Sequence, residues 1–274
     1  MSFSVLLSVY IKEKSDYFDK ALESILINQT LIPDEVVIVK DGPLTENLEN
    51  IIDKYLIMFP SLIKVIPLET NHGLGEALNI GLENCSHDLV ARADTDDINH
   101  PKRFEKQIEL FSQRSDLALI GTNIAEFYDS HKHTQTVKVL PEKSKDIFNW
   151  AKKRNPVNHM TVMFRKEAVE AAGGYKHLFY LEDYYLWVRM LSKDFLFYNL
   201  QEPLVYVRTG DEQFLRRSNR KYIKGWYVLQ KEMRSKEMIN FFELIISMIS
   251  ITVFIFIPVR LKKYIYQFFL RKKQ

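Results

Sequence analysis

The stretch ARADTDD at residues 91–97 follows a short apolar segment of the chain. It places three carboxylates within four positions, Asp94, Asp96 and Asp97, which we call the acid cluster. Mutual repulsion would raise the pKa values of these groups unless a cation lay between them. Oxygen ligands suit Mg²⁺ or Mn²⁺, and such an ion usually completes its coordination with substrate phosphate oxygens. The stretch therefore predicts a metal site for a nucleotide diphosphate. Taken alone, it is explained equally well as a solvated turn capping the helix expected from Pro101.

Four apolar, β-rich segments alternate with segments long enough to form helices. The expected strands are residues 4–10, 35–39, 62–68 and 88–93. Two apolar stripes mark intervening helices: Ala21, Leu22, Ile25 and Leu26, then Leu78, Ile80, Leu82 and Cys85. This alternation is typical of βαβ units in a parallel sheet. Because ligands of such sheets bind beyond the carboxyl ends of the strands, Tyr10, Asp41 and the acid cluster should meet at one edge.

Seven motifs follow one another between residues 8 and 189. They are SVY (8–10), VIVKDG (37–42), NHGL with LNIG (71–81), RADTDDI with PKRF (92–104), HMTVMFR (159–165), GGY (173–175) and EDYYLWVR (182–189). In their order and spacing the chain resembles the family 2 glycosyltransferases with a GT-A fold. The resemblance covers about residues 3–208 and is most specific over 71–104. It implies an α/β fold, a Rossmann-like mixed sheet flanked by helices, followed here by an amphipathic, hydrophobic helical tail.

The same resemblance implies an enzyme that transfers a sugar, with inversion, from a nucleotide diphosphate donor. The family favours a UDP-sugar, with UDP-galactose as the first choice, and a polyprenyl-diphosphate-linked saccharide acceptor in bacterial O-antigen or capsule assembly. Mn²⁺ or Mg²⁺ would act as the Lewis acid for the departing diphosphate. The alternative is a non-catalytic subunit that binds sugar nucleotides or lipid phosphates at the membrane. A nucleotidyltransferase would be expected to carry a G-x-G-T-R-type signature where this chain has YIK at 10–12.

Donor and metal contacts are also implied by the resemblance, residue by residue. The full set expected at the nucleotide sugar is Ser8, Val9, Tyr10, Glu13, Asp41, Asn71, Asn79, Arg92, Asp94 and Thr95. Glu13 is equally well explained as a solvated loop acid, and Arg92 as an ion-pair partner of the acid cluster. Asp94, Asp96 and Asp97 are the expected metal ligands, with Asp96 the most direct. The downstream arginine motif of the family is matched only loosely, by Arg208 or by residues 216–217.

An inverting transfer requires one base opposite the leaving group, to take the proton of the incoming hydroxyl. In the resembling family the Asp of the Glu-Asp pair has this role, which therefore falls to Asp183. Glu182 and His159 are expected to contact the acceptor. A helix from 182 onward would bury one face and leave both carboxylates at its first turn. The structural alternatives are that Glu182 and Asp183 only cap the helix, and that His159 is a core histidine.

The charge of the chain is unevenly distributed. Residues 1–207 carry 23 Lys and Arg against 30 Asp and Glu, whereas residues 208–274 carry 15 against 5. We therefore divide the chain into a catalytic domain (1–210) and a basic, hydrophobic, helical C-terminal region (211–274). Residues 244–259 contain no charge but fall short of the ~20 residues that a membrane span needs. We expect this region to associate with an anionic membrane surface. Packing on the catalytic domain, or on a second subunit in a homodimer, is the alternative.

One cysteine, Cys85, excludes an internal disulfide, and no basic segment precedes the first apolar run. These features favour the cytoplasmic face of the plasma membrane, with peripheral or monotopic attachment. Cys85 is expected to be a buried packing thiol. The tail is too apolar for a surface that follows nucleic-acid phosphates, so nucleic acid is not an expected partner.

Overall fold

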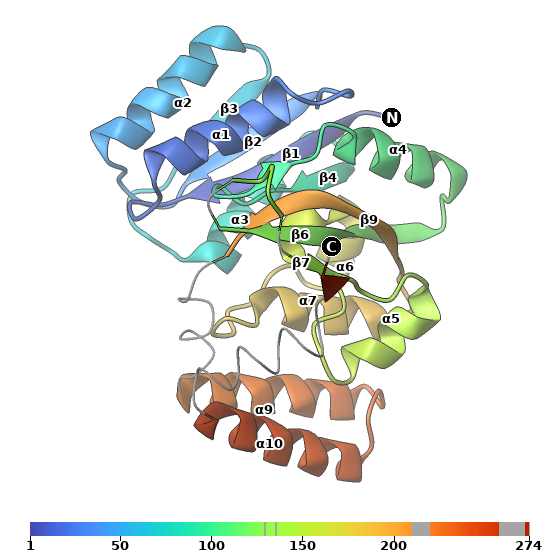
Figure 1. Ribbon diagram of the computed structural model, residues 1–274. Coiled ribbons are helices and arrows are strands. Elements are labelled where there is room, and N and C mark those ends of the chain that lie inside the picture. The colour runs from blue at the N-terminus through green and yellow to red at the C-terminus, as the bar shows by residue number, and fades with distance from the viewer. Residues whose placement is uncertain (129, 135, 210–219, 258–271, 274) are drawn as a thin grey trace.

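The computed structural model describes residues 1–128, 130–134, 136–209, 220–257 and 272–273, and a mixed β-sheet flanked by helices forms its centre (Figure 1). The strands follow the order β10-β7-β6-β8-β4-β1-β2-β3, and β9 pairs with β6 and β5 off this path. Their bounds are β1 (Phe3–Val9), β2 (Glu35–Lys40), β3 (Ile63–Pro67), β4 (Leu89–Arg92), β5 (Ile98–Asn99), β6 (Leu117–Phe127), β7 (Thr136–Lys138), β8 (Met163–Arg165), β9 (Leu196–Arg208) and β10 (Lys272–Lys273).

The helices cover both faces of this sheet. Their bounds are α1 (Ser15–Leu26), α2 (Glu46–Met58), α3 (Leu74–Asn84), α4 (Arg103–Gln113), α5 (Ser144–Ala151), α6 (Lys166–Ala171), α7 (Glu182–Leu191), α9 (Arg220–Ser235) and α10 (Phe241–Phe256), with a 3₁₀ turn at His159–Thr161. The predicted α/β architecture with a mixed sheet is therefore confirmed.

The four strands predicted from the sequence are β1 to β4, and all pair in parallel. Beyond β4 the sheet changes direction, because β8 runs antiparallel to β4 and β6 runs antiparallel to β8. The parallel part brings the carboxyl ends of β1, β2 and β4 to the same edge, as expected for a ligand site.

Alternating side chains of β1 build a core on each face of the sheet. Val5 and Leu7 pack with α1, α2 and α4, whereas Leu6 packs with α3 and with the helices from α5 onward. The apolar stripe of α1 is fully buried, as predicted. Gly81 allows α3 to lie against the sheet, because a Cβ there would be 2.7 Å from Val39 Cγ2 and would overlap Leu6. Cys85 is buried, which confirms the expected packing thiol.

A helical hairpin of α9 and α10 follows the sheet and lies below α7 in Figure 1. α9 packs on α7 through Tyr222 and Trp226, and Trp226 Nε1 donates a 2.9 Å hydrogen bond to Ser247 Oγ of α10. No helix within the described ranges has both the length and the apolar character needed to cross a bilayer. Residues 258–271, which supply several of the terminal cations noted in the sequence, lie outside the described residues.

Candidate active site

The loops after β1 and β4 meet at the carboxyl edge of the parallel strands. Thr95 Oγ1 donates a 2.6 Å hydrogen bond to Glu13 Oε2, which joins the β1–α1 loop to the acid cluster. The backbone N–H of Asp41, just past β2, donates to the carbonyl of Val9 at 2.8 Å. Glu13 is therefore more than a solvated loop acid. The segments that follow β1, β2 and β4 meet at this edge of the sheet.

The acid cluster has the geometry of a cation site. One carboxylate oxygen from each of Asp94, Asp96 and Asp97 lies within 4.8 Å of the others. Burial, and then the charges of Asp94 and Glu13, raise the pKa of Asp96 to about 7. Asp97 Oδ1 accepts from the backbone N–H of Arg208 at 3.1 Å, while its buried Oδ2 has no hydrogen-bond partner among the described residues. An all-oxygen donor set with one unpartnered buried oxygen fits Mg²⁺ or Mn²⁺.

Two buried arginines lie beneath this cluster. Arg92 is almost inaccessible and forms an ion pair with Asp94, which is the structural role that the sequence left open for it. Arg103 donates to the backbone carbonyl of Arg92 at 2.7 Å and to Gln107 Oε1 at 3.2 Å. Burial, and then the charge of Arg92, lower the pKa of Arg103 to about 9. The two guanidinium groups therefore hold the Asp94 side chain and the backbone of Arg92, at the start of the loop that carries the carboxylates.

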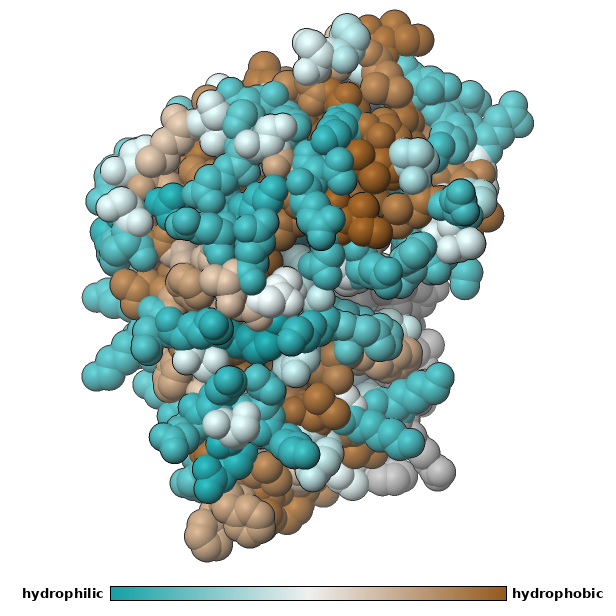
Figure 2. All heavy atoms as spheres, turned by 180° about the vertical axis from the view of Figure 1, so that it is seen from behind, coloured by the Kyte–Doolittle hydropathy of each residue, from teal (hydrophilic) through white to brown (hydrophobic). Residues whose placement is uncertain are grey.

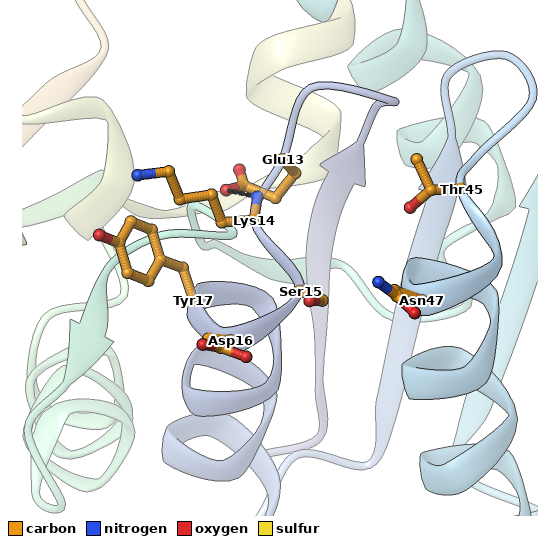
Figure 3. Close-up of a pocket in the computed structure, with 7 residues that line it drawn as sticks. All are labelled: Glu13, Lys14, Ser15, Asp16, Tyr17, Thr45 and Asn47. Carbon is orange, nitrogen blue, oxygen red and sulfur yellow. Dashed lines mark hydrogen bonds between the residues drawn. The ribbon is translucent and has the colours of Figure 1, made fainter.

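A pocket of about 490 Å³ opens beside the β1–α1 loop (Figure 3). Its lining is polar and comes from the starts of α1 and α2: Glu13, Lys14, Ser15, Asp16, Tyr17, Thr45 and Asn47. Glu13 is the one residue of this lining that the sequence assigned to the donor. Since Glu13 also contacts Thr95, the pocket adjoins the acid cluster.

Most of the hydrogen-bonding capacity of the Asp41 carboxylate is used within the protein. Its carboxylate accepts hydrogen bonds from the backbone of His72 (2.6 Å), from the backbone of Gly73 (3.1 Å) and from Asn71 Nδ2 (2.9 Å). A carboxylate has about four lone-pair positions, so these bonds leave roughly one for a ligand. The structure thus brings Asp41 and Asn71 together, as a scaffold for the start of α3.

Other residues assigned to the donor differ in accessibility. The Val9 side chain is fully buried and its carbonyl accepts the hydrogen bond from Asp41, whereas Tyr10 is 39% exposed. Ser8 lies in the β1–β2 ladder opposite Val39 and is partly buried. Asn79 pairs reciprocally with the backbone of Tyr175, donating at 2.8 Å and accepting at 2.7 Å. Asn79 therefore anchors the GGY loop.

The expected base lies in the first turn of α7. Asp183 Oδ2 accepts a 2.6 Å hydrogen bond from Asn155 Nδ2, which lies in the loop after α5. Burial, followed by the charge of Asp183, raises the pKa of Glu182. A Cβ on Gly75 would lie 3.5 Å from Glu182 Cγ, so the start of α7 lies beside the start of α3. Both carboxylates occupy the helix start that the sequence predicted.

His159 is packed as a core histidine would be. Its Nε2 lies 2.9 Å from the hydroxyl oxygen of Tyr175, and its ring centroid is 6.0 Å from that of Trp187. Burial, and then the charge of Arg92, hold the pKa of His159 well below its usual range. The imidazole therefore packs between Tyr175 of the GGY loop and Trp187 of α7.

Sequence reasoning missed Asn155 and gave only a loose role to Arg208. The guanidinium carbon of Arg208 lies 3.7 Å from the ring centroid of Tyr17 and 4.7 Å from that of Phe127. This stacking fixes the end of β9 against the acid cluster, to which the Arg208 N–H is bonded. No local pattern connects Asn155 to Asp183 across the 28 positions between them.

Comparison with known proteins agrees with this arrangement. The family profile described as Glycosyl transferase family 2 matches residues 4–173. The chain is 40% identical to the amylovoran biosynthesis glycosyltransferase AmsE of Erwinia amylovora, over 97% of this chain and 98% of that protein. It is 35% identical to a UDP-Gal:alpha-D-GlcNAc-diphosphoundecaprenol beta-1,3-galactosyltransferase of Escherichia coli, over 98% and 97% of the two chains.

Solved structures share the fold at lower identity. S. aureus TarS 1-349 in complex with UDP-GlcNAc superposes with a TM-score of 0.64 at 20% identity, over 85% of this chain and 66% of that one. The chain spans 40–66% of the TarS chains that it matches. The mannosyltransferase PcManGT of Pyrobaculum calidifontis, in complex with GDP-Man and Mn2+, gives a TM-score of 0.63 at 11% identity, over 96% and 78%.

Proposed function

Since the chain belongs to glycosyl transferase family 2 and is a glycosyltransferase with the GT-A fold, we propose that it uses UDP-galactose as its donor and a saccharide on polyprenyl diphosphate as its acceptor. The observation that carries the proposal is the hydrogen bond between Glu13 and Thr95. It joins the loop beside a polar pocket of about 490 Å³ to an acid cluster suited to a diphosphate-bound cation. The name of the E. coli relative supports the choice of sugar and acceptor.

Asp94, Asp96 and Asp97 would hold Mg²⁺ or Mn²⁺. When bound, such an ion supplies Lewis-acid stabilisation of the charge that develops on the leaving diphosphate. The raised pKa of Asp96 supports this assignment, because a buried carboxylate among other carboxylates ionises readily only beside a cation. The Mn2+ in the structure of PcManGT supports it as well. Arg92 pairs with Asp94, and Arg103 donates to the backbone carbonyl of Arg92. These contacts fix the start of the loop that carries the carboxylates.

Asp183 would remove the proton from the acceptor hydroxyl as that oxygen attacks the sugar. A single base on the face opposite the leaving group inverts the configuration at the anomeric carbon. Asn155 fixes one carboxylate oxygen of Asp183, which orients the side chain for this transfer. Glu182 lies one residue earlier on the same helix turn and would contact the acceptor saccharide, with His159 behind it.

A lipid-linked acceptor would place the enzyme at the cytoplasmic face of the membrane, in the assembly of a bacterial surface polysaccharide. The name of AmsE, which refers to amylovoran biosynthesis, supports this setting.

The donor is tested by incubating the purified protein and Mn²⁺ with a panel of UDP- and GDP-sugars and measuring the slow hydrolysis of each one. Transfer to GlcNAc diphosphate on a short lipid tests the acceptor. We expect UDP-galactose to be consumed, and Asp183→Asn to bind UDP without transferring sugar. Consumption of a different sugar would overturn the donor assignment. Tight UDP binding with no turnover of any donor would favour the non-catalytic subunit.

A further inference from the structure

The outward face of α10 is apolar from Phe241 to Val253. Six side chains on this face, which we call the α10 stripe, are 39–75% exposed: Phe241, Phe242, Ile245, Ile246, Ile249 and Val253. They recur at helical spacing and gather at the base of the molecule (Figure 2), where α10 is the outermost element. An exposed patch of this kind marks an interaction surface.

The stripe is not needed to attach α10 to the protein. The opposite face, with Leu244, Met248 and Ile251, already packs against the core that includes α7 and α9. A capping box between Asn240 and Glu243 begins the helix. α10 is therefore a well-anchored helix with apolar residues on both faces, and its outer face is available for a partner.

The charge of the hairpin indicates which partner. α9 exposes four cations, Lys221, Lys224, Lys231 and Arg234, and Lys236 follows its end. The acids of the hairpin are Glu232, Glu237 and Glu243, of which Glu243 is the one charged residue of α10. A second copy of the chain would bring the same positive charge to the contact. An anionic lipid surface would instead accept the apolar stripe and attract the cations. α10 has 16 residues, fewer than the ~20 that a perpendicular transmembrane helix needs, so we assign it an orientation along the surface.

We propose that α10 lies flat in an anionic lipid surface, with the α10 stripe at the acyl boundary and the α9 cations near the headgroups. A chain held in this way would meet the proposed lipid-linked acceptor in one orientation. In this respect the inference rests on the proposed function. α9 packs directly on the segment before Glu182, because a Cβ on Gly225 would lie 3.3 Å from Leu181 Cδ1. The ring of Trp226 lies 5.9 Å from that of Tyr184, in the first turn of α7. The docking hairpin therefore supports the helix that carries Asp183.

Sedimentation with vesicles tests the inference without donor or acceptor, so its failure is separate from failure of the proposed function. The full chain is mixed with vesicles of phosphatidylcholine alone, or of phosphatidylcholine with phosphatidylglycerol. We expect binding to the anionic vesicles, weakened by salt and by Lys224→Gln with Lys231→Gln. Ile246→Glu and Ile249→Glu should each lower the partition coefficient by roughly tenfold or more, because an apolar anchor is replaced by an acid.

Ile57→Glu is the matched control, since Ile57 is 81% exposed on α2, away from the hairpin. It should bind vesicles like the unmodified chain. UDP titration and thermal unfolding should be unchanged in all these variants. Unchanged sedimentation of both α10 variants, or an equal loss in Ile57→Glu, would overturn the inference. So would a dimer in analytical ultracentrifugation that the α10 variants split without any effect on lipid binding, because the stripe would then cover a second copy.

Discussion

Asn155 Nδ2 donates a 2.6 Å hydrogen bond to Asp183 Oδ2, so a loop residue orients the carboxylate that we assign as the base. A hydrogen bond to a charged group is worth about 1.5–3 kcal/mol, so Asn155→Ala should lower kcat roughly 10- to 100-fold. The acid limb of the pH–rate profile should also move to higher pH, because the carboxylate loses a donor that favours its ionised form. Lys153→Ala, at an exposed position of the same loop, is the control. An unchanged pH profile would limit Asn155 to a structural role.

Asp183→Asn retains the size of the side chain but removes its ability to accept a proton. We expect kcat to fall by roughly 10²–10⁴, while the affinity for UDP with Mn²⁺ changes little. Calorimetry measures the affinity, and a radiolabelled transfer assay measures kcat. Normal turnover in Asp183→Asn together with an inactive Glu182→Gln would move the base to Glu182.

Metal binding at the acid cluster should depend on pH. Burial and neighbouring acids raise the pKa of Asp96 to about 7, above its ordinary value of 3.8, so the folded protein retains this proton after the unfolded chain has lost it. Metal-free stability should therefore decline as the pH rises from about 4 to about 7. Mn²⁺ competes with the proton, so it should raise Tm more at pH 8 than at pH 5.

Differential scanning fluorimetry measures that difference, and Asp96→Asn should abolish it. Asp53→Asn, at an exposed position on α2, should behave like the unmodified chain. Chelation should stop transfer until Mn²⁺ or Mg²⁺ is restored. Full activity in excess chelator would contradict the metal assignment.

Gly42 and Gly73 offer a matched pair of stability tests, because both have φ of +86°. A Cβ on Gly42 would lie 2.9 Å from the backbone nitrogen of Asn71, whereas a Cβ on Gly73 would meet nothing within 4 Å. Gly73→Ala should cost about 1–3 kcal/mol for the backbone conformation alone, because a φ of 86° with a ψ of 158° is a combination that essentially only glycine adopts. Gly42→Ala should cost a further ~1–3 kcal/mol for the steric overlap. Urea denaturation measures both, and equal losses would contradict the close approach of these loops.

The sequence predicted β1 to β4 and the start of α7 well, because each combines an apolar run with a clear boundary. It also placed the acid cluster correctly, since those carboxylates are neighbours in the chain. It was less informative about Asp41 and Asn79, whose side chains are bonded to backbone groups about 30 and 96 positions away. A motif records which residue type is present, but tertiary hydrogen bonds determine whether its atoms remain available to a ligand. Asn155 and Arg208 acquire their places only through such contacts.

The packing of α9 and α10 has a practical consequence for anyone shortening this protein. Met238 and Ile239 are buried in the same core as Trp187, and Leu244 and Met248 of α10 pack against it. A truncation before α10 would therefore uncover part of the core that α7 shares, and the shortened protein would tend to aggregate. Point substitutions on the exposed α10 stripe remove its outer apolar surface while leaving that core intact. They therefore separate loss of the proposed lipid contact from loss of the fold.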